Sequence, residues 1–168
     1  MKEYKLDKKD YIVVFDKKLY RIISLINFGN IKKGEKGGFV EGFHNLSHSG
    51  NAWVHNNAQV YGKARVHGNA HIYGNAYVSD NAHIYGDAQV YGEACIYGEA
   101  CVYGEAHVHG EARVHGYAYV HGNALVYGEA YVYGEAYVHD NAQVYGKARV
   151  YGYARVHGNA HIYGNPHE

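Results

Sequence analysis

The sequence contains no threonine, a single proline (Pro166) and only two cysteines (Cys95 and Cys101) among its 168 residues. Neither positive nor negative charge is in excess, because 16 Lys and Arg balance 16 Asp and Glu. This balance argues against the broad basic surface typical of nucleic-acid binding and against the dense acidic surface of a DNA mimic.

A long hydrophobic run is missing as well. No segment approaches the roughly 20 apolar residues of a membrane-spanning helix. The N-terminal stretch MKEYKLDKKDY is charged and has no apolar core of the kind found in signal peptides. We therefore expect a cytoplasmic protein without a membrane span.

What the sequence has in abundance is glycine, tyrosine and histidine (22, 20 and 14 residues), arranged in repeated hexads. Alanine occupies every sixth position from Ala52 to Ala160, nineteen times, and Val or Ile follows two residues later each time, from Val54 to Ile162. The segment NLSHSG (45–50) is a degraded first copy. An uninterrupted period of this kind predicts a solenoid.

Each hexad predicts a short strand followed by a corner. Residues two apart point to the same side of a strand, so Ala and Val/Ile face the interior while the variable Tyr, His, Arg and Gln face outward. The Gly-Asn or Gly-Glu pair between units favours a turn. A helix is excluded because a period of six keeps no apolar stripe on one helical face. The constant phase also disfavours a meander of hairpins.

The unit V-Y-G-N-A-H resembles the hexapeptide repeat of left-handed β-helix proteins. The lead-in GGFVEGFHNLSHSGNAWVHNNA (37–58) is similar to bacterial and phage hexapeptide-repeat proteins commonly labelled as acetyltransferases. This resemblance implies an all-β fold, a single-stranded left-handed β-helix with three hexads per coil and about six to seven coils. β-Helices that bind ice present ordered threonine ranks, which this sequence cannot form.

The two ends depart from the repeat. Residues 1–44 break the period and are predicted to form a small β-rich N-terminal cap, followed by the β-helix over 45–168. Within the cap, YIVVF (11–15) and LYRIISLI (19–26) favour either a hairpin or a strand followed by a short helix. At the other end, Pro166 stands in an alanine position and removes one backbone donor. We expect the C-terminal coil to contact a second copy or a partner, the alternative being a capped edge with a frayed tail.

With three hexads per coil, outward positions three hexads apart form columns. One face carries the column His67, Tyr85, Tyr103, His121, His139, His157 beside Arg65, His83, Cys101, Tyr119, Tyr137, Arg155. Another carries Tyr61, Ser79, Tyr97, His115, Tyr133, Tyr151 beside Gln59, Tyr77, Cys95, Arg113, Tyr131, Arg149. At one corner, Glu93, Glu111 and Glu129 form a column that we interpret as a solvated edge.

The aromatic columns have two interpretations. Stacked rings on adjacent strands stabilise a sheet, and the pairs Arg149–Tyr131 and Arg155–Tyr137 are candidate cation–π contacts. The same residue types are also enriched in recognition surfaces. The second interpretation places a binding surface in the C-terminal half, at Tyr119, His121, Tyr131, Tyr133, Tyr137, His139, Arg149, Tyr151, Arg155 and His157.

Histidine and cysteine are the residue types here that could bind a metal or form a disulfide. His121, His139 and His157, about 4.8 Å apart in one column, are the candidates for a metal ion, but an open flat row without a carboxylate is not a closed coordination shell, and no metal site is predicted. Cys95 and Cys101 lie on consecutive faces, farther apart than the ~7 Å that a disulfide tolerates, so both are predicted to be free thiols.

These observations favour a non-catalytic β-helix scaffold that presents flat Tyr/His-rich faces to a protein partner or to a second copy, with a phage-encoded modulator of a host protein as a special case. The alternative is an acyltransferase. The resemblance implies that such an enzyme uses acetyl-CoA in a site between subunits, with a catalytic histidine and loops that interrupt the coils. Residues 45–165 contain no such insertion, and no catalytic residue stands out. No cofactor is expected outside this alternative.

Overall fold

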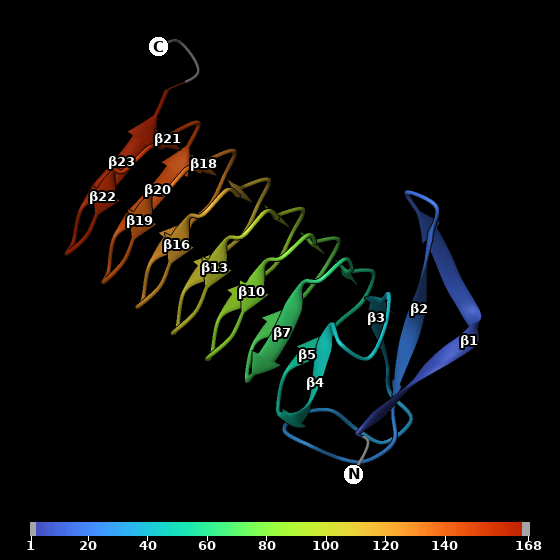
Figure 1. Ribbon diagram of the computed structural model, residues 1–168. Helices are drawn as coiled ribbons and strands as arrows, with labels where there is room; N and C mark the ends of the chain where they lie inside the picture. The colour runs from blue at the N-terminus through green and yellow to red at the C-terminus, as the bar shows by residue number, and fades with distance from the viewer. Residues whose placement is uncertain (1–2, 166–168) are drawn as a thin grey trace.

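The computed structural model describes residues 3–165, which form a β-solenoid of stacked coils with a β-hairpin at one end (Figure 1). The described residues contain no helix, and thus none long and apolar enough to cross a membrane. Successive short strands fall on three faces in turn, and each face is a parallel sheet. The predicted all-β solenoid is confirmed.

The strands are grouped here by face. Face 1 comprises β3 (Lys36–Val40), β6 (Gln59–Val60), β9 (Tyr77–Val78), β12 (Cys95–Ile96), β15 (Arg113–Val114), β18 (Tyr131–Val132) and β21 (Arg149–Val150). Face 2 comprises β4 (Leu46–Gly50), β7 (Arg65–Gly68), β10 (His83–Ile84), β13 (Cys101–Val102), β16 (Tyr119–Val120), β19 (Tyr137–Val138) and β22 (Arg155–Val156). Face 3 comprises β5 (Trp53–Val54), β8 (His71–Ile72), β11 (Gln89–Val90), β14 (His107–Val108), β17 (Leu125–Val126), β20 (Gln143–Gly146) and β23 (His161–Gly164).

The strand register shows that three hexads complete one coil. On face 2, for example, Tyr119 lies beside Tyr137 and Val120 beside Val138. The coils are joined by backbone hydrogen bonds, such as the one that the Tyr137 N–H donates to the Ala154 carbonyl at 2.9 Å. Within residues 3–165, each face holds seven coil strands. The columns of equivalent residues therefore exist as predicted.

The solenoid interior is filled by the repeated alanines and β-branched residues. From Ala58 to Val144 these side chains are at most 1% exposed. Because inward and outward residues alternate, each face has one inward column of Val or Ile and, beside a corner, one inward column of alanine. Toward β23 the interior opens, since Ile162 is 37% exposed. Pro166 lies outside the described residues, so the predicted contact of the C-terminal coil with a second copy stays a prediction.

The corners turn through a residue with positive φ. Glycine supplies this conformation at most corners, as at Gly110 with φ +70°, while Asn56, Asp80 and Asp140 supply it at three others. A Cβ at Gly110 would lie 3.0 Å from the backbone N and O of Gly128 in the next coil. Both conformation and space therefore select the smallest residue here.

Replacing Gly110 by valine should lower the free energy of unfolding by about 3 kcal/mol, because left-handed φ and the backbone contact both penalise a β-branched side chain. Gly110→Asn should cost only about 1 kcal/mol, since asparagine adopts this conformation at Asn56. Urea unfolding followed by circular dichroism measures both. If the two variants lose the same free energy of unfolding, stability does not depend on how readily the residue at this corner adopts a positive φ.

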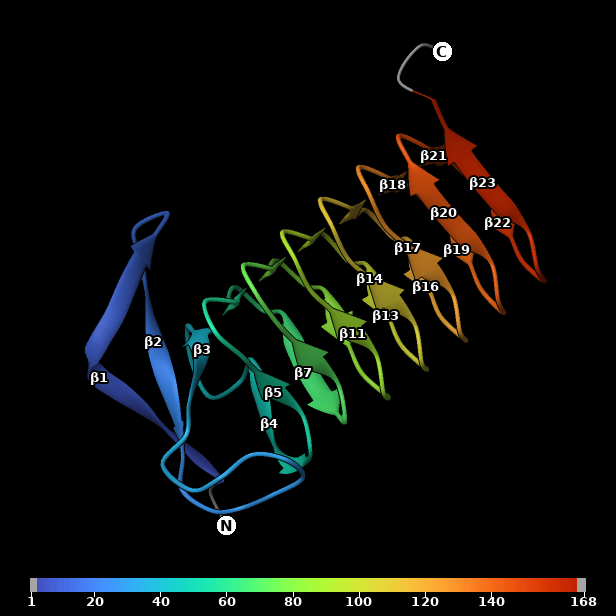
Figure 2. The same cartoon turned by 180° about the vertical axis from the view of Figure 1, so that it is seen from behind.

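The N-terminal residues form a hairpin of β1 (Tyr4–Val14) and β2 (Lys17–Ser24), with antiparallel pairing from Tyr4–Ser24 to Val14–Lys17. The alternative of a short helix after the first strand is wrong. β2 pairs antiparallel with β3, and β3 pairs parallel with β6, so the hairpin extends the sheet of face 1 beyond the coils. Figure 2 shows the hairpin and β21–β23 at opposite ends of the solenoid.

An aromatic cluster closes the solenoid end beneath the hairpin. The fully buried Trp53 ring packs edge-on against Phe28 at 5.6 Å and against Tyr4 at 6.2 Å. The Tyr4 hydroxyl donates a 2.7 Å hydrogen bond to the Leu46 carbonyl. Leu46 in turn lies beside Val66, so the degraded hexad 45–50 joins face 2 in a shifted register. Apolar surface that a bare first coil would expose is thereby covered.

Candidate binding faces

Face 2 carries an unbroken ladder of stacked rings along the solenoid. Consecutive ring centroids are 4.7–5.4 Å apart and the planes differ by at most 15°. The members, one from each coil, are His67, Tyr85, Tyr103, His121, His139 and His157. The spacing follows from the strands, which lie about 4.8 Å apart and hold equivalent side chains in parallel.

Stacking determines which part of each ring is available. The ring faces cover one another, so the outward surface consists of ring edges that carry hydroxyl groups and imidazole nitrogens. Desolvation by neighbouring rings lowers the pKa of His67 and His121 and raises the pKa of Tyr85 and Tyr103. At neutral pH these four members of the ladder are uncharged hydrogen-bonding groups on a rigid backbone.

The second column of face 2 adds a cation. Tyr119 stacks on Tyr137 at 4.9 Å, and the Arg155 guanidinium lies 5.3 Å from the Tyr137 ring centroid. The predicted cation–π contact is present. Six of the predicted surface residues therefore lie together on the C-terminal half of face 2: Tyr119, His121, Tyr137, His139, Arg155 and His157.

The other four predicted residues lie on face 1. The Tyr131 ring has the Arg113 guanidinium at 5.3 Å and the Arg149 guanidinium at 5.7 Å. Tyr133 stacks on His115 at 5.1 Å and on Tyr151 at 5.4 Å. The ten predicted residues thus lie on two faces, as the columns in the sequence implied. At the corner between them, Tyr117 and Tyr153 are 55% and 80% exposed. This pair was not predicted, although a spacing of two coils places Tyr117 and Tyr153 in the same corner column.

Face 3 carries a further ladder that was not predicted. Tyr91, His109, Tyr127 and Tyr145 stack at 4.6–5.1 Å. Near the cap, His55 Nε2 lies 3.0 Å from His71 Nδ1, and the His55 ring stacks on Tyr73 at 4.2 Å. Burial, together with the neighbouring His71, lowers the pKa of His55 to about 4. His55 is therefore neutral at physiological pH.

Among residues 3–165, no three His, Cys, Asp or Glu side chains are grouped so that they could hold a metal ion. The candidate histidines His121, His139 and His157 stack face to face, and nitrogen lone pairs in parallel ring planes do not converge on one point. Cys95 on face 1 and Cys101 on face 2 are free, as predicted. Burial raises the pKa of both thiols, which makes them poor nucleophiles at neutral pH.

The solenoid corners carry polar columns. Asn123 donates to Asn141 at 3.3 Å, and Asn141 donates to Asn159 at 3.2 Å, along the corner between faces 2 and 3. The corner between faces 3 and 1 has the predicted glutamate column, and Lys147 in the next coil lies 3.6 Å from Glu129. Such exposed pairs contribute little to stability.

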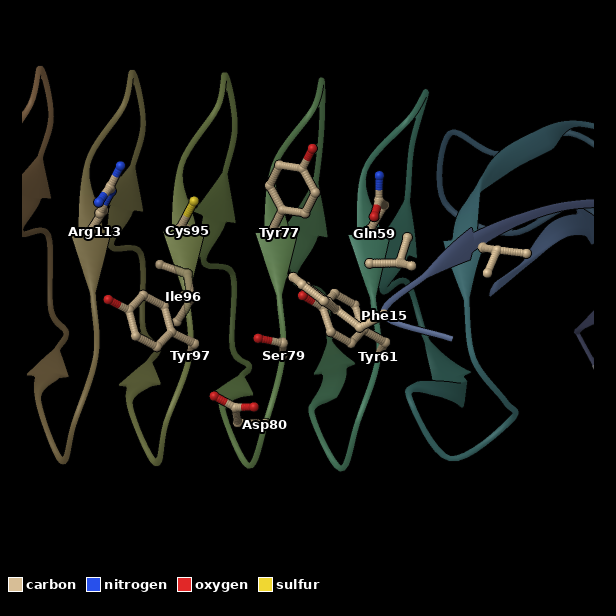
Figure 3. A pocket seen from close by; sticks show the side chains of 12 residues that line it. Phe15, Gln59, Tyr61, Tyr77, Ser79, Asp80, Cys95, Ile96, Tyr97 and Arg113 are labelled. Carbon is tan, nitrogen blue, oxygen red and sulfur yellow. The ribbon is translucent and has the colours of Figure 1, made fainter. Parts of the chain in front are cut away.

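A groove of about 730 Å³ lies between the hairpin tip and face 1 (Figure 3). The hairpin contributes Val13, Val14 and Phe15, and face 1 contributes the outward side chains of four successive coils: Gln59, Tyr61, Tyr77, Ser79, Asp80, Cys95, Tyr97 and Arg113. This groove was not predicted, because no periodic signal says where a non-repetitive hairpin lies relative to the repeat.

Comparison with known proteins agrees with the coil geometry. A family model of the YdcK beta solenoid repeat matches residues 58–74 and 142–158. This chain is similar to that repeat. The two segments begin at equivalent alanines, Ala58 and Ala142, which stand on different faces, so the likeness to the YdcK beta solenoid repeat does not depend on which face a hexad occupies. The match describes a repeat, and the acyltransferase label is no part of it. No curated protein matches the chain.

Proposed function

We propose that this chain is a binding scaffold that presents the C-terminal half of face 2 to another protein. The observation that carries the proposal is the unbroken ring ladder from His67 to His157, flanked by Tyr119, Tyr137 and Arg155. The ladder holds polar ring edges in fixed positions, so a partner that binds them does not have to order flexible side chains. Tyrosine and arginine are also the residue types that dominate protein interfaces energetically.

The orientation of the rings favours a protein over a nucleic acid or a sugar. Bases stack on exposed ring faces, but on face 2 those faces are occupied by the neighbouring rings. Ring edges with hydroxyl and imidazole groups instead suit the hydrogen-bonding groups of a protein surface. If the chain is a phage-encoded modulator, the partner is a bacterial protein. A second copy of the chain is the first partner to test.

The experiment uses substitutions that the chain itself makes at equivalent positions. Tyr137→Gln with His139→Ser changes face 2, and Tyr131→Gln with Tyr133→Ser makes the same change on face 1. Gln and Ser occupy these outward positions at Gln59 and Ser79, so both double variants should fold. We expect the face 2 variant to weaken partner binding at least tenfold, about 1.4 kcal/mol, and the face 1 variant to weaken it less than about threefold.

Binding is measured in two steps. Analytical ultracentrifugation of the wild type tests for a second copy, and affinity capture from a bacterial lysate, followed by titration of the captured protein, tests for another partner. Equal losses of affinity in both variants, or no loss of affinity in either, would show that face 2 is not the binding surface. Thermal stabilisation by acetyl-CoA would instead support the acyltransferase alternative.

A further inference from the structure

The ring ladder of face 1 is interrupted at one rung. Tyr97 stacks on His115 at 4.7 Å, and the stack continues through Tyr133 to Tyr151. One coil before Tyr97 the column holds Ser79, and one coil earlier Tyr61. Within residues 3–165, Tyr61 stacks on no ring, and nothing stacks on the side of Tyr97 that faces Ser79. Figure 3 shows Ser79 between the two tyrosines, with the Phe15 ring in front of Tyr61.

The interruption has the dimensions of one aromatic ring. Steps of the unbroken ladder on face 2 measure 4.7–5.4 Å between centroids. Tyr61 and Tyr97 are two steps apart, so one planar ring above Ser79 would lie at ladder distance from both. A saturated ring is thicker than an aromatic one and fits this space less well. Ser79 is only 9% exposed, so the floor of the gap is sheltered.

The hairpin tip extends over this groove and carries one aromatic side chain, Phe15. Phe15 is 84% exposed and has a φ of +47°, a conformation that bulky residues rarely adopt. The hairpin is held against the coils by the Lys17–Glu41 ion pair at 3.0 Å and by Arg21, which donates to the Asn56 carbonyl at 3.0 Å. In Figure 3 the Phe15 ring projects over the end of the groove that holds Tyr61. Phe15 thus partly covers the groove.

The opposite end of the groove is cationic. The Arg113 guanidinium lies 5.3 Å from the Tyr131 ring centroid. Glu93 and Glu111 line a neighbouring hollow together with Arg113, but no carboxylate of residues 3–165 forms an ion pair with it within 4.0 Å. The groove carboxylate, Asp80, already accepts a hydrogen bond from the Gly98 N–H at 3.0 Å. Burial raises the pKa of Tyr97, Arg113 opposes this shift, and Asp80 contributes least. Among the charged side chains that act on Tyr97, Arg113 has the largest effect, and it is positive.

We propose that the groove binds a small planar aromatic carboxylate, whose ring completes the ladder between Tyr61 and Tyr97 and whose carboxylate pairs with Arg113. The volume of about 730 Å³ lies within the range of small-molecule sites. Ring stacking selects planarity, and the guanidinium selects an anion. The site is on another face from the protein-binding surface and does not depend on it.

The first test compares two acids that differ only in ring shape. Isothermal titration of the full chain with 3-phenylpropionate should give saturable binding with a Kd of about 1 mM or tighter. 3-Cyclohexylpropionate, with the same tail and charge, should bind at least about fivefold more weakly, because a non-planar ring cannot stack on both tyrosines. Absence of binding up to about 10 mM, or equal affinity for the two acids, would overturn the proposal.

The second test fills the gap from within. Ser79→Tyr supplies the missing rung and should weaken 3-phenylpropionate binding at least about tenfold. Cys101→Tyr, the same kind of change on face 2, is the matched control and should leave binding unchanged. Arg113→Gln should weaken binding of the acid but not of 3-phenylpropionamide, which carries no charge. Wild-type affinity in a folded Ser79→Tyr protein would show that the ligand binds elsewhere.

Discussion

Replacing Val108 by aspartate should abolish the cooperative fold or lower the free energy of unfolding by at least about 4 kcal/mol. Val108 has no exposed surface and lies in the middle of the solenoid, with Val90 and Val126 beside it in the neighbouring coils. A carboxylate there meets only aliphatic side chains, so it must either remain charged without a partner or take up a proton at neutral pH. Either outcome lowers the free energy of unfolding by more than most single substitutions do.

The control is the neighbouring residue in the same strand. His107 points outward, and His107→Asp should change the free energy of unfolding by less than about 1 kcal/mol. Chemical unfolding of both variants, followed by far-ultraviolet circular dichroism, separates the inward from the outward residue. If the two substitutions cost the same, the alternation of inward and outward side chains that underlies every column is incorrect.

Acid should destabilise the fold well before carboxylates are protonated. Burial holds the pKa of His55 at about 4 in the folded chain, against 6.5 in the unfolded chain. The unfolded state therefore binds more protons between these values, so the stabilisation is complete above pH 6.5 and is lost as the pH falls toward 4. Because solvent screens this partly buried ring, His55 alone should account for a loss of about 1 kcal/mol at pH 5.0 relative to pH 7.5. Desolvation lowers the pKa of further histidines, which adds to the loss: His67, His71, His109, His115 and His121.

His55→Tyr provides the test of this assignment. Tyrosine occupies the same column in the next coil, at Tyr73, so the variant keeps a ring in the stack while removing the titrating group. Unfolding at constant ionic strength should show a smaller difference between pH 7.5 and pH 5.0 in the variant than in the wild type. A wild type that is equally stable at both pH values would contradict the buried, neutral state of these histidines.

Much of the solenoid could be predicted because the information is local and repeated. Alternation within A-x-V-x assigns Ala and Val to one side of a strand, and positive-φ residues such as Gly110 mark the corners. The coil length came from the resemblance to hexapeptide repeats, and the pairing of Tyr119 with Tyr137 confirms it. Once three hexads make a coil, the ring ladders and the Arg155–Tyr137 contact follow from parallel stacking alone.

The features without a repeat could not be predicted in this way. β3 joins face 1 because Gly38 lies against the Ala58 carbonyl, where a Cβ would approach within 2.5 Å, and no period reveals that contact. The exposed position of Phe15 depends on the antiparallel pairing of β2 with β3 and on the Lys17–Glu41 ion pair. The missing rung at Ser79 is visible in the sequence as a single unusual residue, but only the overhanging hairpin makes it part of a groove.

By itself, then, the sequence determined which side chains are inside, which are outside and, with the coil length, which stack on one another, since each of these depends on spacing along the chain. Only the tertiary structure decided how the non-repetitive hairpin lies over face 1 and which ring faces remain uncovered. These depend on contacts between residues distant in the chain, such as Arg21 with Asn56, whose energies no local pattern encodes.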